Sequence, residues 1–375
     1  MTVFLLAYIL IYGSMQVVFY LRIQALVPQG VWLRSLVCLF LALMIVAPIL
    51  ARLLEANGMI ALATGLAWVG YTWMGFVFLA FCLSLLLFAV DGGLVLTGKL
   101  AGLTIRRLPA RLTALCLLLA CLGLSLYGVY ESNQLKVERL RIQTEKLPSG
   151  AGLTVVQISD LHLGLILRQE SVEWMIEQVR DIGPDLLVCT GDLVDGNLER
   201  LNRLAPAFAS IMPDKGGFAV SGNHETYAGV KASFTFLEKA GFQGLRDEVR
   251  LVDPSVALVG MDYSREQRCD REQALLNSVA SERYTVLLKH SPEVCPGSQG
   301  RFDLQLSGHT HNGQIFPFSL VVDLVYDYVS GLHFLEDGSQ VYVSRGTGTW
   351  GPQMRILSPP ELTVIEIQGR DGPTG

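Results

Sequence analysis

The segment LTVVQISDLH, residues 153–162, joins an apolar run to two polar side chains. Leucine, threonine, valine and isoleucine lead directly to Asp160 and His162. Such a run is typical of a short buried strand that ends in a turn. Because Asp160 and His162 are two residues apart, an extended backbone would direct both side chains to one side. The segment therefore predicts a strand that ends in two metal-ligand side chains.

The same arrangement recurs four more times towards the C-terminus. Each time an apolar run ends, a turn with glycine or other small polar residues follows, and the turn carries Asp, Asn or His. Five of the six histidines of the chain lie in these turns, which argues against a chance distribution. Ligand-type side chains at several strand ends can converge on one crevice. The side chains are Asp192 and Asp195, then Asn223, His224 and Glu225, then His290, and finally His309 and His311.

Strand-type and helix-type segments alternate between these turns. Apolar spacing and composition predict helices near 172–182, 198–211 and 230–240. Alternation at first and mostly strands later predict an α/β domain over 151–370, with two mixed β-sheets sandwiched by helices. The predicted strands are 153–158, 186–189, 218–220, 256–259, 285–288, 304–306, 340–343 and 362–367.

The first 131 residues have the composition of a membrane anchor. About 20 apolar residues cross the hydrocarbon core of a bilayer. We therefore expect an α-helical transmembrane region of about four helices at 1–131, followed by a polar linker at 132–150. The four apolar stretches are 2–21, 36–50, 59–90 and 112–130.

Two alternatives remain open within the anchor. The first stretch could be a cleaved signal peptide, although it lacks a basic start and a small-residue cleavage site. The third stretch has 32 residues without a charge, so a hairpin of two short spans is an alternative to one long helix. Trp68, Tyr71 and Trp73 lie near its start, where an interfacial aromatic belt would fall.

Charge is divided unevenly between the two parts. Residues 1–150 hold 11 Lys and Arg but only 5 Asp and Glu, whereas residues 151–375 hold 18 and 29. The acidic second part argues against nucleic acid as a partner, because Lys and Arg bind phosphate backbones. Seven cysteines, an odd number with no CxxC, predict neither a disulfide framework nor a thiolate zinc site.

Basic loops predict the orientation of the anchor in a plasma membrane, the inner membrane of a bacterium. Basic residues favour the cytoplasmic side, and six lie between spans one and two or between spans three and four. The catalytic domain of this multi-pass protein is then expected outside the cytoplasm, although basic residues at 136–146 count against this orientation. The six residues are Arg22, Arg34, Lys99, Arg106, Arg107 and Arg111.

The polar turns resemble those of the calcineurin-like metallophosphoesterases over about residues 153–367. S-R-G-T-G-T-W-G at 344–351 and G-H-T-H-x-G-Q at 308–314 resemble the membrane-anchored bacterial branch of that family. This branch includes phosphodiesterases and hydrolases of UDP-2,3-diacylglucosamine. Asn312 stands where many relatives have glycine. The motifs in order are D-x-H at 160–162, G-D-x-x-D at 191–195, G-N-H-E at 222–225, a single His290, and G-H-x-H at 308–311.

The resemblance implies two divalent metal ions, such as Mn, Fe or Zn, and hydrolysis of a phosphate ester or pyrophosphate. Such a pair of cations activates water for attack on phosphorus. His224 is implied as the catalytic group beside the leaving oxygen, and Asp195 and Glu225 are expected to orient imidazoles. One metal would be held by Asp160, His162, Asp192 and His311, and the second by Asp192, Asn223, His290 and His309, with Asp192 bridging the two.

Features outside the motifs favour a lipid or lipid-linked phosphate as substrate, with membrane lipids as partners. Arg345 or Arg355 could bind substrate phosphate, the alternative being ordinary surface arginines. The apolar residues 315–334 could form a wall or flap for an acyl chain, the alternative being core packing.

Two alternative functions remain open. Hydrolysis of UDP-2,3-diacylglucosamine, in lipid A biosynthesis, would require a cytoplasmic active site. A catalytically inactive membrane sensor or scaffold is an alternative of another class, although no expected ligand is missing.

Overall fold

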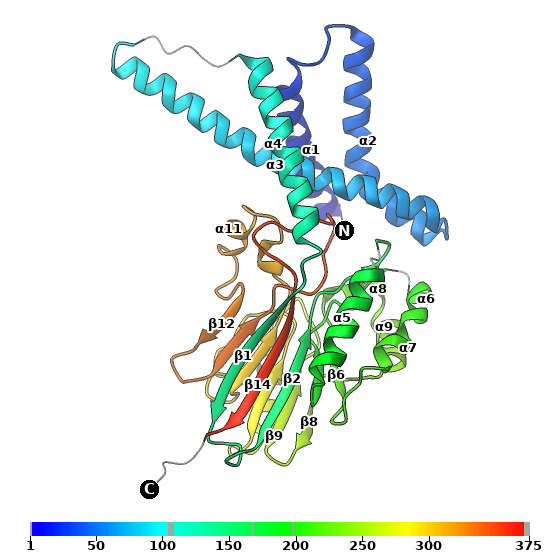
Figure 1. Cartoon of the computed structure of the whole chain (residues 1–375), viewed down its shortest axis with the longest axis vertical. Helices are drawn as coiled ribbons and strands as arrows, with labels where there is room; N and C mark the ends of the chain where they lie inside the picture. The colour runs from blue at the N-terminus through cyan, green and yellow to red at the C-terminus, as the bar shows by residue number, and fades with distance from the viewer. Residues whose placement is uncertain (1, 104–108, 167–168, 197, 371–375) are drawn as a thin grey trace. The chain divides into compact units, whose positions relative to one another are not determined.

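The chain forms two compact units in a computed structural model that describes residues 2–103, 109–166, 169–196 and 198–370 (Figure 1). One unit comprises Met1–Tyr130 with Gly351–Met354, and the other comprises Glu131–Trp350 with Arg355–Gly375. Arg106 and Arg107, which contributed to the expected orientation, lie outside the described residues.

Four long apolar helices make up most of the first unit. Each of them is long and apolar enough to cross a membrane. The stretch at 59–90 forms part of one continuous helix, α3, rather than a hairpin of two spans, because it contains no proline to interrupt the backbone hydrogen bonds. The helices are α1 (Thr2–Ile23), α2 (Val31–Ala56), α3 (Ile60–Leu100) and α4 (Ala110–Glu131).

Two six-stranded mixed sheets form the centre of the second unit. Their strand orders are β1-β14-β2-β4-β6-β7 and β12-β13-β11-β10-β9-β8. In each sheet four strands run parallel: β2, β4, β6 and β7 in the first, and β9, β10, β11 and β13 in the second. The first sheet consists of β1 (Lys136–Thr144), β14 (Glu361–Gly369), β2 (Gly152–Ile158), β4 (Leu186–Cys189), β6 (Gly217–Ala219) and β7 (Phe242–Gly244). The second consists of β12 (Gly331–Phe334), β13 (Gln340–Val343), β11 (Leu304–Ser307), β10 (Tyr284–Leu288), β9 (Val256–Gly260) and β8 (Glu248–Asp253).

Helices cover the outer faces of the two sheets and complete the predicted α/β sandwich. Apolar residues of both sheets, among them Val155 and Val286, form one core between them. The helix α5 (Gln169–Ile182) buries Met175 against the first sheet, in a core that also includes residues of α9 (Val230–Lys239). Leu276 of α10 (Cys269–Asn277) contributes to a core on the second sheet. The fold class expected from the sequence is therefore confirmed.

The predicted linker at 132–150 contains a strand. Residues 136–144 form β1, which pairs in parallel register with β14. As an edge strand, β1 exposes charged side chains such as Arg141, which pairs with Glu366 at 2.9 Å. Charge is common on edge strands, where it opposes pairing with other chains. The polar composition that indicated a linker thus reflects the edge position.

A predicted helix at 198–211 is divided into shorter elements. The structure contains α6 (Leu198–Leu201), a 3₁₀ turn at 202–204 and α7 (Ala205–Ala209). Pro206 lies in the first turn of α7, where its missing N–H is tolerated, but within a continuous helix it would break the hydrogen-bond ladder.

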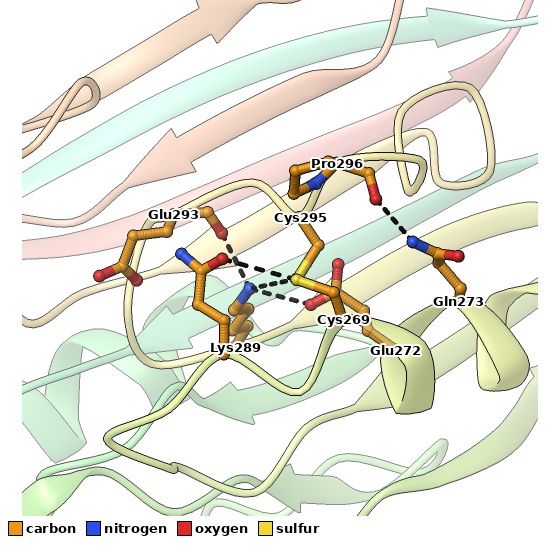
Figure 2. The surroundings of a disulfide bond; sticks show 8 residues. Cys269, Glu272, Gln273, Lys289, Glu293, Cys295 and Pro296 are labelled. Carbon is orange, nitrogen blue, oxygen red and sulfur yellow. Dashed lines mark hydrogen bonds and ion pairs between the residues drawn. A yellow bond between two sulfur atoms is a disulfide. The ribbon is translucent and has the colours of Figure 1, made fainter.

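One disulfide bond joins Cys269 at the start of α10 to Cys295, which follows β10 (Figure 2). The cysteine count predicted no disulfide framework, and it did not reveal this single bond. Their Cα atoms are 5.4 Å apart. Folding, not sequence spacing, brings them together, since 26 residues separate them. Beside the disulfide, the Lys289 ammonium lies 2.9 Å from a carboxylate oxygen of Glu272, and Figure 2 shows this ion pair.

Candidate metal centre

The predicted ligands follow the carboxyl ends of five strands. Asp160 and His162 follow β2, and Asp192 follows β4. Asn223 begins the short helix α8 (Asn223–Ala228) after β6, and the remaining three follow β10 and β11 of the other sheet. The sheets are tied together here, because the His309 N–H donates to the Asp160 carboxylate at 3.0 Å. Parallel strands in both sheets thus deliver all the ligands to one edge of the sandwich.

One group of donor atoms consists of Asp160, His162 and His311. The Nε2 atoms of the two histidines are 3.0 Å apart, and Nε2 of His311 is 3.4 Å from Oδ1 of Asp160. All three residues are buried, and their donor atoms lie within 4.8 Å of one another. Nitrogen and carboxylate donors at these separations can share one divalent cation.

A second group contains Asn223, His290 and His309. Nε2 of His290 is 3.1 Å from Nδ1 of His309 and 3.2 Å from Oδ1 of Asn223. The other nitrogen of each imidazole has a partner: Nδ1 of His290 lies 2.8 Å from the Thr190 carbonyl, and Nε2 of His309 lies 2.9 Å from the Tyr326 hydroxyl. Such partners fix the tautomer that leaves the inward nitrogen free to bind a metal.

The Asp192 carboxylate lies between the two groups. Its Oδ2 atom is 3.9 Å from Nε2 of His162 in the first group and 3.3 Å from Nε2 of His290 in the second. Its Oδ1 accepts a hydrogen bond from the backbone N–H of His224 at 2.8 Å, which fixes the carboxylate. Asp192 therefore lies where one carboxylate could contact cations in both groups.

The electrostatics of the site also fit cations. Burial and neighbouring histidines lower the pKa of His162 to about 3 and the pKa of His309 to about 4, so both imidazoles are neutral, as metal ligands must be. Burial alone would lower the pKa of His290, but the carboxylates of Asp192 and Asp160 raise it to about 10. The two buried carboxylates thus favour positive charge at the centre, which divalent cations would supply.

The backbone around the ligands adopts conformations that non-glycine residues rarely take. Asp160, His162, Asp192, His309 and His311 all have φ between 50° and 73°. Left-handed backbone at such residues stores strain and is frequent at functional sites. The motif glycines allow the close packing that this geometry needs. A Cβ at position 308 would collide with the Asp160 carboxylate, and one at position 222 with the Asp192 carboxylate.

Comparisons with known proteins bear on the same segment. The calcineurin-like phosphoesterase family model matches residues 153–313. A metallophosphoesterase of Aquifex aeolicus is 39% identical over 253 residues, which cover 66% of this chain and 97% of that protein. The chain belongs to the calcineurin-like phosphoesterase family.

Two further relatives of this phosphoesterase carry additional residues. A metallophosphoesterase of Helicobacter pylori is 34% identical over 256 residues, covering 66% of this chain and 68% of that protein. A transmembrane protein with metallophosphoesterase domain from Danio rerio is 32% identical over 277 residues, covering 69% of this chain and 63% of that protein. The Danio rerio relative, by its name, combines a transmembrane region with a metallophosphoesterase domain.

His224 of this phosphoesterase lies beside the ligands. Its ring centroid is 4.6 Å from that of His162, and its Nδ1 atom is 3.0 Å from Oδ1 of Asp195. Burial lowers the pKa of His224, but the hydrogen bond to Asp195 and the charge of Asp192 outweigh it and raise that pKa. Asp195 therefore contacts the imidazole of His224 in a position to orient it.

Glu225 has a different role from the predicted one. Its buried carboxylate accepts hydrogen bonds from the backbone N–H groups of Asp192, Gly222 and Val194, at 2.8, 2.7 and 3.1 Å. It contacts the loop backbone, whereas the prediction assigned it to an imidazole. Glu225 thus holds the Asp192 turn against the turn after β6, and so sets where the bridging carboxylate lies.

Of the two arginines considered for binding substrate phosphate, Arg345 is engaged in ion pairs and Arg355 is fully buried. Arg345 forms ion pairs with Glu138 and Glu361 in the region of the first sheet. Arg355 is 0% exposed, and its guanidinium donates to several backbone carbonyls, including that of Gly348. Nη2 of Arg355 lies 3.2 Å from Nδ1 of His311. This arginine therefore contacts the ring nitrogen of His311 that does not face the other ligands.

Tyr326 is a site residue that the sequence motifs did not reveal. It belongs to the apolar segment 315–334, which was considered only for its hydrophobicity. Its hydroxyl orients His309 from outside the ligand set. A tyrosine 17 residues from its histidine has no local pattern, so only the fold could bring the pair together.

Proposed function

We propose that this chain is a membrane-anchored phosphoesterase that uses two divalent cations to hydrolyse a phosphodiester, phosphomonoester or pyrophosphate. The observation that carries this proposal is the single Asp192 oxygen that faces both groups of ligands. Two cations bound there would make water nucleophilic at neutral pH and neutralise charge on the phosphate. The family membership supports the reaction class, and the buried carboxylates and neutral imidazoles support the cations.

The residues of the chain divide the remaining work. Asp160, His162 and His311 would hold one cation, and Asn223, His290 and His309 the other, with Asp192 shared. His224 can donate a proton to the leaving oxygen, since its Nδ1 is held by Asp195 and its Nε2 faces the ligands, 4.0 Å from Oδ2 of Asp192.

A phosphate attached to a lipid is the substrate class that we favour. A chain with four candidate membrane helices meets membrane-confined substrates at high local concentration. We also propose that the phosphoesterase domain lies outside the cytoplasm. The Cys269–Cys295 disulfide supports this side, because such bonds persist in oxidising compartments. UDP-2,3-diacylglucosamine, the alternative substrate, would require the opposite side.

Replacement of Asp192 by asparagine tests the proposed function. Asp192→Asn keeps an oxygen that can accept from the His224 N–H but removes the shared negative charge. We expect phosphoesterase activity to fall by more than the ~10–100-fold typical of residues that only orient a metal ligand. The assay uses the full chain in nanodiscs, stripped of metal and then supplied with Mn, Fe or Zn, against lipid and soluble phosphate esters.

Asp253→Asn is the matched control, because Asp253 pairs with Lys215 away from the ligands. It should retain full activity. If the unmodified chain hydrolysed no ester with any metal, the scaffold alternative would replace the enzyme. Equal activities of Asp192→Asn and the unmodified chain would remove the bridging role.

A further inference from the structure

Large apolar side chains gather in one segment of the surface of the second unit. We call Phe316, Phe318, Leu320, Val321, Leu324 and Val325 the apolar rim; all six are exposed, Leu324 by 87%. Ile315, Val322 and Val329 within and around the same segment are buried, so the segment is anchored in the fold while the rim points outward. Contiguous exposed apolar patches mark interaction sites. Core packing, the alternative considered above, is thus wrong for the rim.

The rim adjoins the metal centre. Tyr326 directly follows Val325 and contacts His309 through its hydroxyl.

The Gln314 side chain, two residues before Phe316, forms hydrogen bonds with both the N–H and the carbonyl of the Trp350 backbone. The exposed Trp350 ring in turn lies 6.0 Å from the His224 ring. The residues that border the rim in sequence are therefore linked by contacts to the metal centre.

The rim also adjoins the point where the chain leaves the fourth candidate span. Glu131 is the last residue of α4, and its carboxylate accepts a hydrogen bond from the N–H of Leu357 at 2.8 Å. The neighbouring Ile356 carbonyl accepts from the N–H of Phe316 at 3.1 Å. Two consecutive backbone positions thus connect the end of α4 to the start of the rim.

Sheet topology places the metal centre at this same end. The strand β1 begins at Lys136, five residues after α4 ends at Glu131. Its neighbour β14 is parallel to β1, and the next strand in the sheet, β2, runs in the opposite direction to both. The start of β1 and the carboxyl end of β2 therefore lie two strand spacings apart, roughly 10 Å. Figure 1 shows the short helix α11 (Ser319–Val322) of the rim at the end of the domain where β1 starts.

We propose that the apolar rim inserts into the lipid bilayer that holds α1–α4, and that it delivers the phosphate of a bilayer lipid to the metal centre. The lipid-substrate part of this inference rests on the proposed function, whereas the bilayer contact does not. Apolar burial, rather than charge, drives the contact, because the exposed Asp323 and Asp327 flank Leu324 and Val325 and would repel anionic lipids. The contact is therefore expected to persist at high salt.

Quenching of an introduced tryptophan by dibrominated lipid tests the contact. The full chain is reconstituted in nanodiscs as Leu324→Trp and, for comparison, as Leu251→Trp. Leu251 is also an exposed leucine, but it lies on β8 opposite Ala257, near the start of β9 and far from its carboxyl end. After subtraction of the emission of the unmodified chain, the Leu324→Trp emission should be quenched by brominated lipid and the Leu251→Trp emission should not.

Turnover provides the second arm of the test. The double variant Leu324→Asp/Val325→Asp should hydrolyse a long-chain phosphate ester embedded in the nanodisc about tenfold more slowly or worse, since two apolar contacts are lost. It should hydrolyse the water-soluble bis-p-nitrophenyl phosphate within about twofold of the unmodified chain. Leu251→Asp should change neither rate.

The outcomes separate the rim from the proposed function. Equal quenching of the two tryptophan variants, or equal loss on both substrates, overturns the rim proposal. A change in the oligomeric mass of the nanodisc-embedded double variant also overturns it, because a second copy would then cover the rim. If the unmodified chain cleaves neither ester, the proposed function fails, and quenching alone decides whether the rim contacts lipid.

Discussion

Asp195 shows at the residue scale how one carboxylate can set the working pH of the site. It holds Nδ1 of His224, and together with Asp192 it raises the pKa of His224 against the opposing effect of burial. A general acid acts while protonated, so its contribution is present below its pKa and is lost as pH rises through that value. The proposed reaction therefore has an alkaline limit that depends on Asp195.

Asp195→Asn is expected to move that limit to lower pH. The substitution keeps the shape of the side chain but removes its charge, so the pKa of His224 should fall. The alkaline limb of a plot of kcat/KM against pH should shift to lower pH with it, while Asp253→Asn leaves it in place. An unchanged limb in Asp195→Asn would show that another group controls it.

The role of a residue could be predicted where the motif is local in sequence, and could not be predicted where burial decides that role. Asp160 and His162 lie two residues apart in one turn, and the structure places both in one group of donor atoms. His309 and His311 are also two residues apart, but they contribute to different groups. Arg355 looks like a surface arginine in the sequence, yet the fold buries it completely beneath His311. Burial depends on contacts made by distant segments, which a single sequence does not display.

The boundaries of strands and helices were likewise predicted where a local apolar run defines them and missed where tertiary contacts decide. The strands that end in ligands were predicted within a residue or so, because they are buried on both faces and form continuous apolar runs. The strand β1 was missed, since an edge strand with one exposed face is as polar as a linker. The helix α10 was also missed, because few of its residues are apolar and its packing is reinforced by the Cys269–Cys295 disulfide.

That disulfide gives a prediction at the scale of α10 and the segment after β10. It closes a loop of 26 residues, and a crosslink of this size stabilises a domain by about 3 kcal/mol. The double variant Cys269→Ser/Cys295→Ser should therefore unfold at a temperature lower by about 6–12 °C. The segment after β10 also carries His290, which lies four residues after Val286 and belongs to the second group of ligands. In the double variant, the concentration of metal needed for half-maximal stabilisation of the protein should therefore rise.

Thermal unfolding of the full chain in detergent, with and without added metal, measures both effects. Dithiothreitol provides the internal control: it should lower the unfolding temperature of the unmodified chain and leave the double variant unchanged. Identical unfolding temperatures for the two proteins under oxidising conditions would show that the crosslink does not stabilise this region.

At the scale of the whole molecule, the loop charges of the anchor and the disulfide of the phosphoesterase domain predict the same orientation in the membrane. An even number of spans places both ends of the chain on the same side, and basic loops between spans one and two and between spans three and four favour the cytoplasm for those loops. The disulfide independently favours an oxidising compartment for the domain. Loop charge and cysteine chemistry have separate physical origins, so their agreement carries more weight than either alone.

Reporter fusions in a bacterial host measure this orientation. Alkaline phosphatase fused after Gly375 should be active and green fluorescent protein at the same position dark, because both follow an exported domain. Fusions after Leu103, in the loop between spans three and four, should give the reverse pattern and serve as the control. Mass spectrometry of the trapped Cys269–Cys295 peptide should show the bond intact in cells. A bright fluorescent fusion after Gly375 with reduced cysteines would place the metal centre in the cytoplasm, and would restore cytoplasmic lipid precursors as substrates.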